Sequence, residues 1–372
     1  MKHAHSPAHT HRWWALLCLV LAGSTALVIG QGSGRSASQE RAPLAINACH
    51  VSPIVENLDR SARFYQELGL EVGLPPGNEP LPWDGRPEHL DIHGLPEARI
   101  RFIGARMPGI QCGVEIVEFG GLDRSPVHRR LQDPGAATML VFVRDLEPVL
   151  ARLTQAGVPV VTAGGAPVTM GDGRTRAVVV TDPDGHFVEI AQPDPLPATT
   201  VPASSNVVGL GLRLTVADLD RTLSLYRDRL GLELSGGVRT KDAAITKLLG
   251  LPEAEYRLAG TDVPIRPSGA RGSQGTVHLE FIEFADGIDA VRRSSRIQDP
   301  GSYRLMFGMR DLDAALQALA GARFDVISTH GEPVSMQFGT SLWRIAALPE
   351  HDNLFLVVMQ GPLPLAAGPP AR

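Results

Sequence analysis

The feature that most constrains the fold is a four-residue phrase that occurs four times. Each copy has Asn or Asp second, Leu third and an acidic residue fourth: Glu56-Asn57-Leu58-Asp59, Arg144-Asp145-Leu146-Glu147, Ala217-Asp218-Leu219-Asp220 and Arg310-Asp311-Leu312-Asp313. An apolar run that suits a buried strand precedes each copy, and an amphipathic stretch follows it. The Asn or Asp can accept a hydrogen bond from the first amides of a helix, where the helix dipole also favours the acidic residue. The phrase therefore predicts a strand followed by a capped helix, four times.

The spacing of the copies predicts what each repeat contains. Consecutive copies start roughly seventy to ninety residues apart, which is too long for a solenoid unit. That length is sufficient for one helix and three further strands. We therefore expect an α+β protein built from four βαβββ modules.

A proline-rich segment divides the modules into two pairs. Residues 193–206 combine four prolines with small residues and predict a semi-rigid linker. The two halves also resemble each other in three segments that occur in the same order: 58–71 with 219–233, which has one extra residue before its glycine, 114–119 with 279–284, and 131–135 with 297–301. The expected organisation is a flexible lead-in at 31–45, domains at 46–192 and 207–362, and a disordered tail at 363–372.

Composition excludes several classes of protein. With 372 residues, 43% of them hydrophobic and 20% charged, the chain can bury large cores and is not disordered. Its net charge of −5 gives no broad attraction for nucleic acid or anionic lipid. We expect no nucleic-acid partner, and contact with a membrane only through the N-terminal segment.

Residues 1–30 predict an export signal. A cationic, histidine-rich flank precedes an apolar run from Trp13 to Ile29. Small residues at 24–26 suit cleavage by a signal peptidase, but the run is also long enough to anchor the chain in a thin bilayer. The protein is therefore expected to be exported, periplasmic or extracellular, or else held at the membrane by this segment.

Two insertions interrupt the symmetry of the halves. Residues 74–96, rich in Pro and Gly, and residues 236–272 are expected to form loops over one end of each domain, where binding residues tend to gather. Residues 241–249 predict a short helix within the second insertion.

These features resemble the vicinal oxygen chelate superfamily, which includes glyoxalases, extradiol dioxygenases and bleomycin-resistance proteins. The resemblance rests on His50-Val51 through Phe64-Tyr65 with Leu68-Gly69-Leu70, on the strand at 114–119, and on the turn and strand Asp182-Pro183-Asp184-Gly185-His186-Phe187-Val188-Glu189-Ile190. With the fourfold repeat it covers about residues 46–361. It implies two tandem glyoxalase-like domains, each with an open, barrel-like mixed sheet and a cleft for a divalent metal and a small-molecule ligand.

The resemblance implies metal ligands on the first and last strands of each module. In the first half these positions hold His50, Glu115, Thr138 and Glu189, and complete family sites have His or Gln where Thr138 stands. His50, Glu115 and Glu189 would suit Zn, Fe(II), Mn, Ni or Co, and such a metal would polarise the vicinal oxygens of a substrate. The alternative is that these three residues line a metal-free cleft.

The second half lacks most of these ligands. The corresponding positions hold Gly211, Glu280, Arg304 and Val357. We expect no metal there, and we hypothesise that Arg304 pairs with Glu280 in a degenerate second cleft, joined by His278 from the same face.

Further predictions concern single residues. His89 and His93 are candidates for substrate contact together with Thr138, because alternation at 89, 91 and 93 would place two imidazoles on one face of a strand. His186 is expected to be exposed in its turn. Tyr65 and Tyr226 are expected to pack against the sheet.

Cys49 and Cys112 are both expected to face away from the cleft. In an exported protein they could form a disulfide, and a pair of buried thiols is the alternative.

Three functions remain open from the sequence. The first is a metal-dependent enzyme, either a glyoxalase-like lyase or a dioxygenase-like enzyme, although the dioxygenase chemistry implies two histidines and the set here has only His50. The second is a metal-free protein that binds or sequesters a small molecule, as bleomycin-resistance proteins do. The third is a structural protein whose halves pack together, either within one chain or across a homodimer.

Overall fold

The computed structural model describes residues 43–75, 79–108, 113–171, 173–197, 199–265, 275–285, 288–320 and 324–363. The segment at 1–30 and the Cys112 position lie outside these ranges, as does the side chain of Cys49. Export, anchoring and the disulfide therefore stay predictions. Within the described ranges, no helix has the length and apolar character that crossing a membrane requires.

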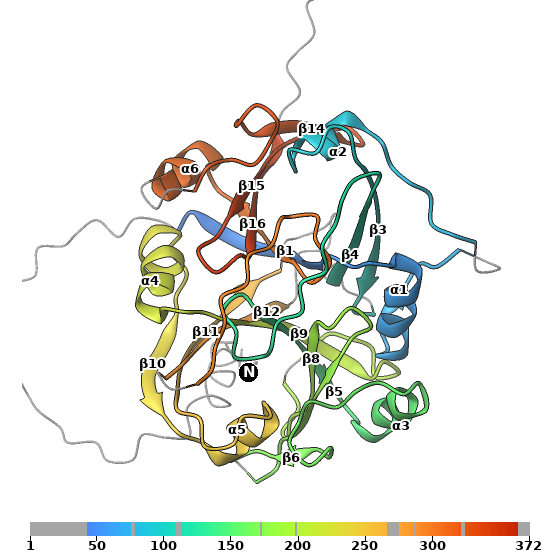
Figure 1. Cartoon of the computed structure of the whole chain (residues 1–372), viewed down its shortest axis with the longest axis vertical. Helices are drawn as coiled ribbons and strands as arrows, with labels where there is room; N and C mark the ends of the chain where they lie inside the picture. Colours follow the sequence, from blue (N-terminus) through green and yellow to red (C-terminus); the bar gives the residue numbers. More distant parts are fainter. Residues whose placement is uncertain are drawn as a thin grey trace, which may run out of the picture.

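Four βαβββ modules follow one another along the chain, as the repeat predicts (Figure 1). The first contains β1 (Ala45–Pro53), α1 (Leu58–Glu67), β2 (Glu71–Val72), β3 (Arg99–Arg106) and β4 (Gly113–Gly120). The second contains β5 (Ala137–Val143), α3 (Glu147–Gln155), β6 (Val168–Thr169), β7 (Arg176–Thr181) and β8 (Phe187–Gln192). The third contains β9 (Val207–Thr215), α4 (Leu219–Leu223), β10 (Ser235–Thr240), β11 (Tyr256–Pro264) and β12 (Thr276–Phe284). The fourth contains β13 (Tyr303–Met309), α6 (Leu312–Ala320), β14 (Val334–Phe338), β15 (Ser341–Pro349) and β16 (Phe355–Leu363).

The insertions contribute one short helix each. These are α2 (Pro87–Asp91) and α5 (Ala243–Leu248), and α5 confirms the helix predicted within the second insertion.

The repeated phrase starts each module helix in the predicted way. The side chains of its Asn and Asp residues accept hydrogen bonds from backbone amides of the first turn: Asn57, Asp145, Asp218 and Asp311. The Leu of every copy is fully buried. Its amide donates to a side chain on the last strand of the same module: Glu118, Gln192, Glu283 and Gln360. The phrase therefore fixes where each helix joins its sheet.

The extra residue in the third module changes the form of its helix. After α4 the chain continues as a π-helical turn, η3 (Ser224–Arg229). Such a turn absorbs a one-residue insertion without shifting the rest of the helix. Tyr226 therefore remains fully buried, like Tyr65 in the first module, which confirms that both tyrosines pack in the core.

The strand order shows that the two modules of one half lie in different sheets. Sheet A has the order β14-β15-β16-β13-β1-β4-β3-β2, and sheet B has the order β10-β11-β12-β9-β5-β8-β7-β6. Sheet A thus joins the first and fourth modules, and sheet B joins the second and third. The reason is that both edges of β5 are already paired, with β8 and β9, so β5 cannot extend the sheet that contains β1. The domain boundaries at 46–192 and 207–362 stay predictions, but strand pairing crosses them.

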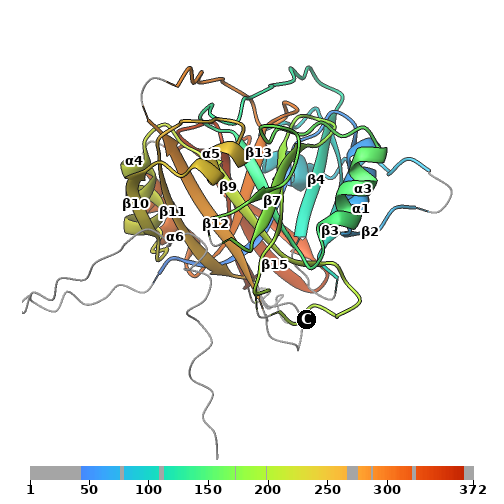
Figure 2. The same ribbon diagram turned by 90° about the horizontal axis from the view of Figure 1, so that it is seen from below.

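The module helices, by contrast, pair within each half. Helix α1 packs beside α3, and η3 packs beside α6; Figure 2 shows α1 and α3 at one side of the molecule and α4 and α6 at the other. Arg152 Nε donates to the carbonyl of Glu67 at 2.9 Å, and Arg229 Nη1 donates to that of Ala318 at 2.8 Å. Each half is therefore held together by its helices while its strands belong to both sheets.

The main core lies between the two sheets and the four module helices. Because side chains alternate along a strand, each sheet also has an outer face. Helix α2 covers part of the outer face of sheet A, and α5 covers that of sheet B, at the top and bottom of Figure 1. The predicted site residues lie on these two outer faces.

Candidate functional site

Site A, on the outer face of sheet A, consists of His50, His93, Glu115 and Arg304. Strands β4, β1 and β13 are neighbours, so they bring Glu115, His50 and Arg304 together. His50 Nε2 lies 3.3 Å from Glu115 Oε2, and Arg304 Nη2 donates to the same oxygen at 3.0 Å. Glu115 is therefore the common partner of the imidazole and the guanidinium.

His93 reaches this group from the turn after α2. Its Nδ1 donates to the carbonyl of His89 at 2.7 Å, so Nε2 carries no proton and accepts a hydrogen bond from Arg304 Nη1. Burial and the nearby guanidinium lower the pKa of His93 to about 3. His93 is therefore neutral and orients Arg304.

Glu115 is ionised despite its surroundings. Burial raises its pKa, but His50 and Arg304 outweigh that effect and hold the pKa at about 2. The side chains of His50 and Glu115 are 27% and 26% exposed, whereas that of Arg304 is 4% exposed. The carboxylate and the imidazole therefore face outward, with the guanidinium behind them.

A second group of side chains lies next to site A. His89 Nδ1 donates to Asp84 Oδ2 at 2.7 Å, and Arg86 donates to the same carboxylate. The rings of Phe102 and Phe338 lie 5.5 and 6.4 Å from the His89 ring, and both phenylalanines are more than one-third exposed. Burial lowers the pKa of His89, so it is neutral at pH 7.

The structure corrects the expected geometry of the two insertion histidines. His89 lies on α2 and His93 one helical turn later, so they share a helical face rather than one face of a strand. The Pro at the start of α2 favours this helix. Contact of either residue with a substrate stays a prediction.

Site B, on the outer face of sheet B, consists of Glu189, Arg213, His278 and Glu280. Arg213 Nη1 lies 2.5 Å from Glu189 Oε2, and its Nε lies 2.7 Å from Glu280 Oε2. His278 joins Glu280 to Asp262, at 3.0 and 2.8 Å. The side chains of Glu189, Arg213 and Glu280 are at most 10% exposed, so site B is a closed ionic network.

Electrostatics keep Arg213 charged. Burial alone would lower its pKa, but Glu189 and Glu280 raise it above the usual value for arginine. Thr138 is buried and lies directly opposite Arg213 in the strand register. Thr138 thus belongs to site B.

Two sequence expectations are therefore wrong. Glu189 does not join His50 and Glu115, because β8 belongs to sheet B while β1 and β4 belong to sheet A. Arg304 pairs with Glu115 rather than Glu280, and the partner of Glu280 is Arg213. His278 does contact Glu280, as expected.

The residues present do not fit a divalent metal. In the part of the chain that the structure describes, no three His, Cys, Asp or Glu side chains are arranged to hold one. At site A three side chains are of ligand type, His50, His93 and Glu115, but Arg304 donates to both His93 Nε2 and Glu115 Oε2 and so occupies acceptor atoms that a metal would need. At site B both carboxylates are already bound by Arg213.

Arg213 was missed from the sequence, although a signal was present. Apart from Arg213 and its terminal threonine, the strand at 207–215 contains only apolar or small residues. A charged residue within such a run must find a buried partner or turn outward. That pattern alone would have marked Arg213 as a site candidate.

The Asp182–His186 turn is more than a strand connection. Asp184 accepts hydrogen bonds from the Glu56 amide and the Ser61 hydroxyl, at 2.8 and 2.5 Å. His186, predicted to be exposed, is only 5% exposed because this turn packs on the first module, and its Nε2 lies 3.1 Å from the carbonyl of Ile54. Tyr65 donates to Asp182 at 3.2 Å.

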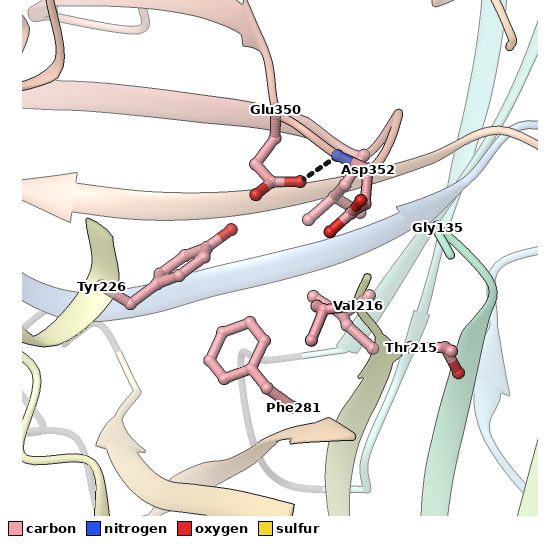
Figure 3. Close-up of a pocket in the computed structure, with 9 residues that line it drawn as sticks. Gly135, Thr215, Val216, Tyr226, Phe281, Glu350 and Asp352 are labelled. Carbon is pink, nitrogen blue, oxygen red and sulfur yellow. Dashed lines mark hydrogen bonds between the residues drawn. The ribbon is translucent and has the colours of Figure 1, made fainter. Parts of the chain in front are cut away.

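The equivalent turn of the fourth module leaves a small cavity (Figure 3). Tyr226 and Glu350 both line it, and the Tyr226 hydroxyl has no hydrogen-bond partner among the described residues. Burial and the nearby Asp352 raise the pKa of Glu350 to about 7. Glu350 occupies the place that Asp182 has in the second module, but Tyr226 does not bond to it.

Comparisons with known proteins agree with this fold. The Glyoxalase/Bleomycin resistance protein/Dioxygenase superfamily matches residues 48–190. Glyoxalase I from Zea mays, at 17% identity, has a TM-score of 0.50 over 84% of this chain and 92% of its own. A mutant of the same enzyme, also at 17% identity, has a TM-score of 0.51 over 84% of this chain and 93% of its own. No curated protein matches the chain. Residues 48–190 therefore match this superfamily, and the four modules in two mixed sheets share the fold of glyoxalase I.

Proposed function

We propose that the protein binds a small, oxygen-bearing molecule at site A without a resident metal ion. The observation that supports this proposal is the position of Arg304. Its buried guanidinium donates to Glu115 and to His93, and so supplies the positive charge that the carboxylate needs. A guanidinium is a permanent cation and cannot leave the site as a metal ion can.

A metal at site A would meet two obstacles. It would have to bind Glu115 beside a fixed positive charge, which costs free energy at these short distances. Otherwise the metal would have to displace the guanidinium from Glu115. Arg304 is only 4% exposed, so its charge would then be buried without the carboxylate that compensates it. These obstacles favour metal-free binding or sequestration over a metal-dependent lyase or dioxygenase.

The exposed groups define what a ligand could contact. Glu115 is anionic and can accept hydrogen bonds from a hydroxyl or amino group. The His50 ring is 27% exposed beside it, but its Nε2 is buried against Glu115, so only the other ring nitrogen, Nδ1, could donate to or accept from a ligand. The export signal predicted at residues 1–30 completes the proposal, in which the protein binds its ligand outside the cytoplasm or at the membrane.

Metal content separates this proposal from the enzymatic alternative. The full chain and its His50→Ala variant would be purified and titrated with Zn, Ni, Co, Mn and Fe(II). We expect no stoichiometric metal in either protein. Stoichiometric metal in the wild type that is lost in the variant would overturn the proposal.

Ligand binding separates it from a purely structural role. A small-molecule library would be screened by thermal shift in the presence of a chelator, on the wild type and on Glu115→Gln. We expect at least one compound to stabilise the wild type and to lose its effect in the variant. A library that stabilises neither protein would count against the proposal.

A further inference from the structure

We infer that the ligand of site A is a small anion with an apolar body, and that it lies along the outer face of β3 between Phe102 and Arg106. This inference rests on the proposed function of site A, because it names the class of molecule that site A would bind. Phe102, Gly104 and Arg106 alternate along β3 with Ile103 and Ala105, which belong to the core between the sheets. The three residues therefore share the outer face with Glu115.

Only a flexible side chain lies over Gly104, beside Glu115. The two residues are directly opposite each other on β3 and β4. A Cβ atom added at Gly104 would meet only the Arg106 side chain, no nearer than 3.5 Å. The floor of site A at this point therefore consists of bare backbone that a ligand can approach closely.

In sheet B, other atoms of the protein fill the space over the equivalent glycine. Gly260 is directly opposite Glu280. A Cβ there would lie 3.3 Å from the Glu280 side chain and 3.3 Å from the carbonyl of Leu279. The space over Gly104 is thus a property of site A and not of the module.

Arg106 supplies a cation at one end of this space. Its side chain is exposed and, among the described residues, has neither a hydrogen bond nor an ion pair. It is opposite Gly113 on β4, which is in turn opposite His50 on β1, so Arg106 and His50 flank a position without a side chain. Glu71 lies opposite Arg106 on β2, but no ion pair joins the two among the described residues, so the guanidinium of Arg106 is available to an anion.

The equivalent position in sheet B has the opposite charge. In β3, Arg106 lies two residues after Gly104. In β11, the residue two positions after Gly260 is Asp262, which is bound to His278. The network of site B is therefore satisfied within the protein. A free guanidinium at the same position in site A suits a carboxylate or phosphate, which it can bind through two parallel hydrogen bonds.

Phe102 supplies an apolar contact at the other end. It is 38% exposed, and with Phe338, which is 44% exposed, it flanks the His89 ring. Four residues along a strand span about 13 Å, and Arg106 Nε folds back over Gly104. The guanidinium is therefore nearer to Phe102 than the backbone separation, which suits one ring with a short acidic chain. Aromatic side chains bind such rings by stacking or by edge contacts.

The test compares matched acidic and neutral probes on the full chain, by calorimetry with a chelator present. The probes are 3-phenylpropionate, phenyl phosphate and the uncharged 3-phenylpropionamide. We expect at least one anion to bind about tenfold more tightly than the amide, because hydrogen bonds to a charged group are the stronger ones. The two anions distinguish a carboxylate ligand from a phosphate ligand.

Three variants locate the binding. Arg106→Gln should remove the preference for the anion. Gly104→Val should weaken the binding of all three probes, because its side chain would occupy the space over residue 104. Arg99→Gln is the matched control, since Arg99 is an exposed arginine of the same strand that stacks on Trp83 instead, and it should leave the preference unchanged.

Each failure has its own meaning. Neutral and acidic probes that bind equally well, or a preference that survives in Arg106→Gln, would overturn this inference and leave site A as a binding site. The absence of binding by every probe and by every library compound would overturn the proposed function as well.

Discussion

Sites A and B occupy equivalent places on the two sheets, and they differ in how completely their charges are satisfied. In site B one guanidinium bridges two buried carboxylates, and His278 extends the network to Asp262. In site A the carboxylate of Glu115 remains about one-quarter exposed. The duplicated modules thus produced one closed ionic core and one face that still has groups available to a ligand.

The insertion helices explain part of this difference. Leu248 and Leu249, at the end of α5, pack in the apolar cluster on the outer face of sheet B. Helix α2 instead brings His89 and His93 to sheet A. The helix of sheet B thus extends an apolar cluster, whereas that of sheet A places two buried imidazoles beside site A.

Replacing each bridging arginine by methionine should give the largest contrast between the two sites. Arg213→Met would leave Glu189 and Glu280 buried without a cation, and we expect a loss of about 3–5 kcal/mol in the free energy of unfolding. Arg304→Met should cost about 1–2 kcal/mol, because Glu115 keeps His50 and some contact with water. Urea denaturation of the two variants measures the difference, and equal losses would show that site A is as closed as site B.

Much of this architecture could be predicted from the sequence. The repeated phrase identified the four modules, because capping chemistry is local and each cap lies within a few residues of its helix. The extra residue before Gly231 is visible in the sequence, but the π-helical turn η3 that accommodates it was not predicted.

The assembly of the sites could not be predicted in the same way. Strands β5 and β13 are both apolar runs of similar length, and nothing local tells β1 which of them to pair with. That choice depends on long-range packing, so Glu189 and Arg304 were assigned to the wrong partners. The burial of His186 has the same origin, because it depends on a turn that packs against a distant segment.

The two equivalent turns show a similar asymmetry, which pH should reveal. Glu350 is 8% exposed, and its pKa of about 7 is above the usual 4.5, so the folded state binds its proton more tightly than the unfolded state does. Its contribution to stability should therefore be complete below about pH 4.5 and fall as the pH rises towards 7. Glu350→Gln stays neutral, so its free energy of unfolding relative to that of the wild type should rise by roughly 2–3 kcal/mol between pH 4.5 and pH 8.

The wild type and Glu350→Gln would be unfolded with urea across that pH range. Comparing them cancels the contributions of all other titrating groups. A difference that does not change with pH would mean that Glu350 is ionised in the folded protein throughout.

The two floor glycines test whether the space in site A is free. Gly260→Val should cost about 1–3 kcal/mol, because its side chain would press on Glu280 and on the Leu279 backbone. Gly104→Val should change stability by less than about 1 kcal/mol, since only the flexible Arg106 side chain is near. Thermal unfolding of both variants measures this, and a large loss at Gly104 would contradict the open floor.

The smallest contrast concerns the two buried tyrosines. Tyr65→Phe removes a hydrogen bond to Asp182 and should cost about 1 kcal/mol. Tyr226→Phe should change stability by no more than about 0.5 kcal/mol, because the Tyr226 hydroxyl has no partner among the described residues and its loss leaves no new group unpaired. Urea denaturation at pH 6 compares the two variants. Equal losses would indicate that the hydroxyl of Tyr226 is bonded through an ordered water in the cavity of Figure 3, and that the two turns are equally satisfied.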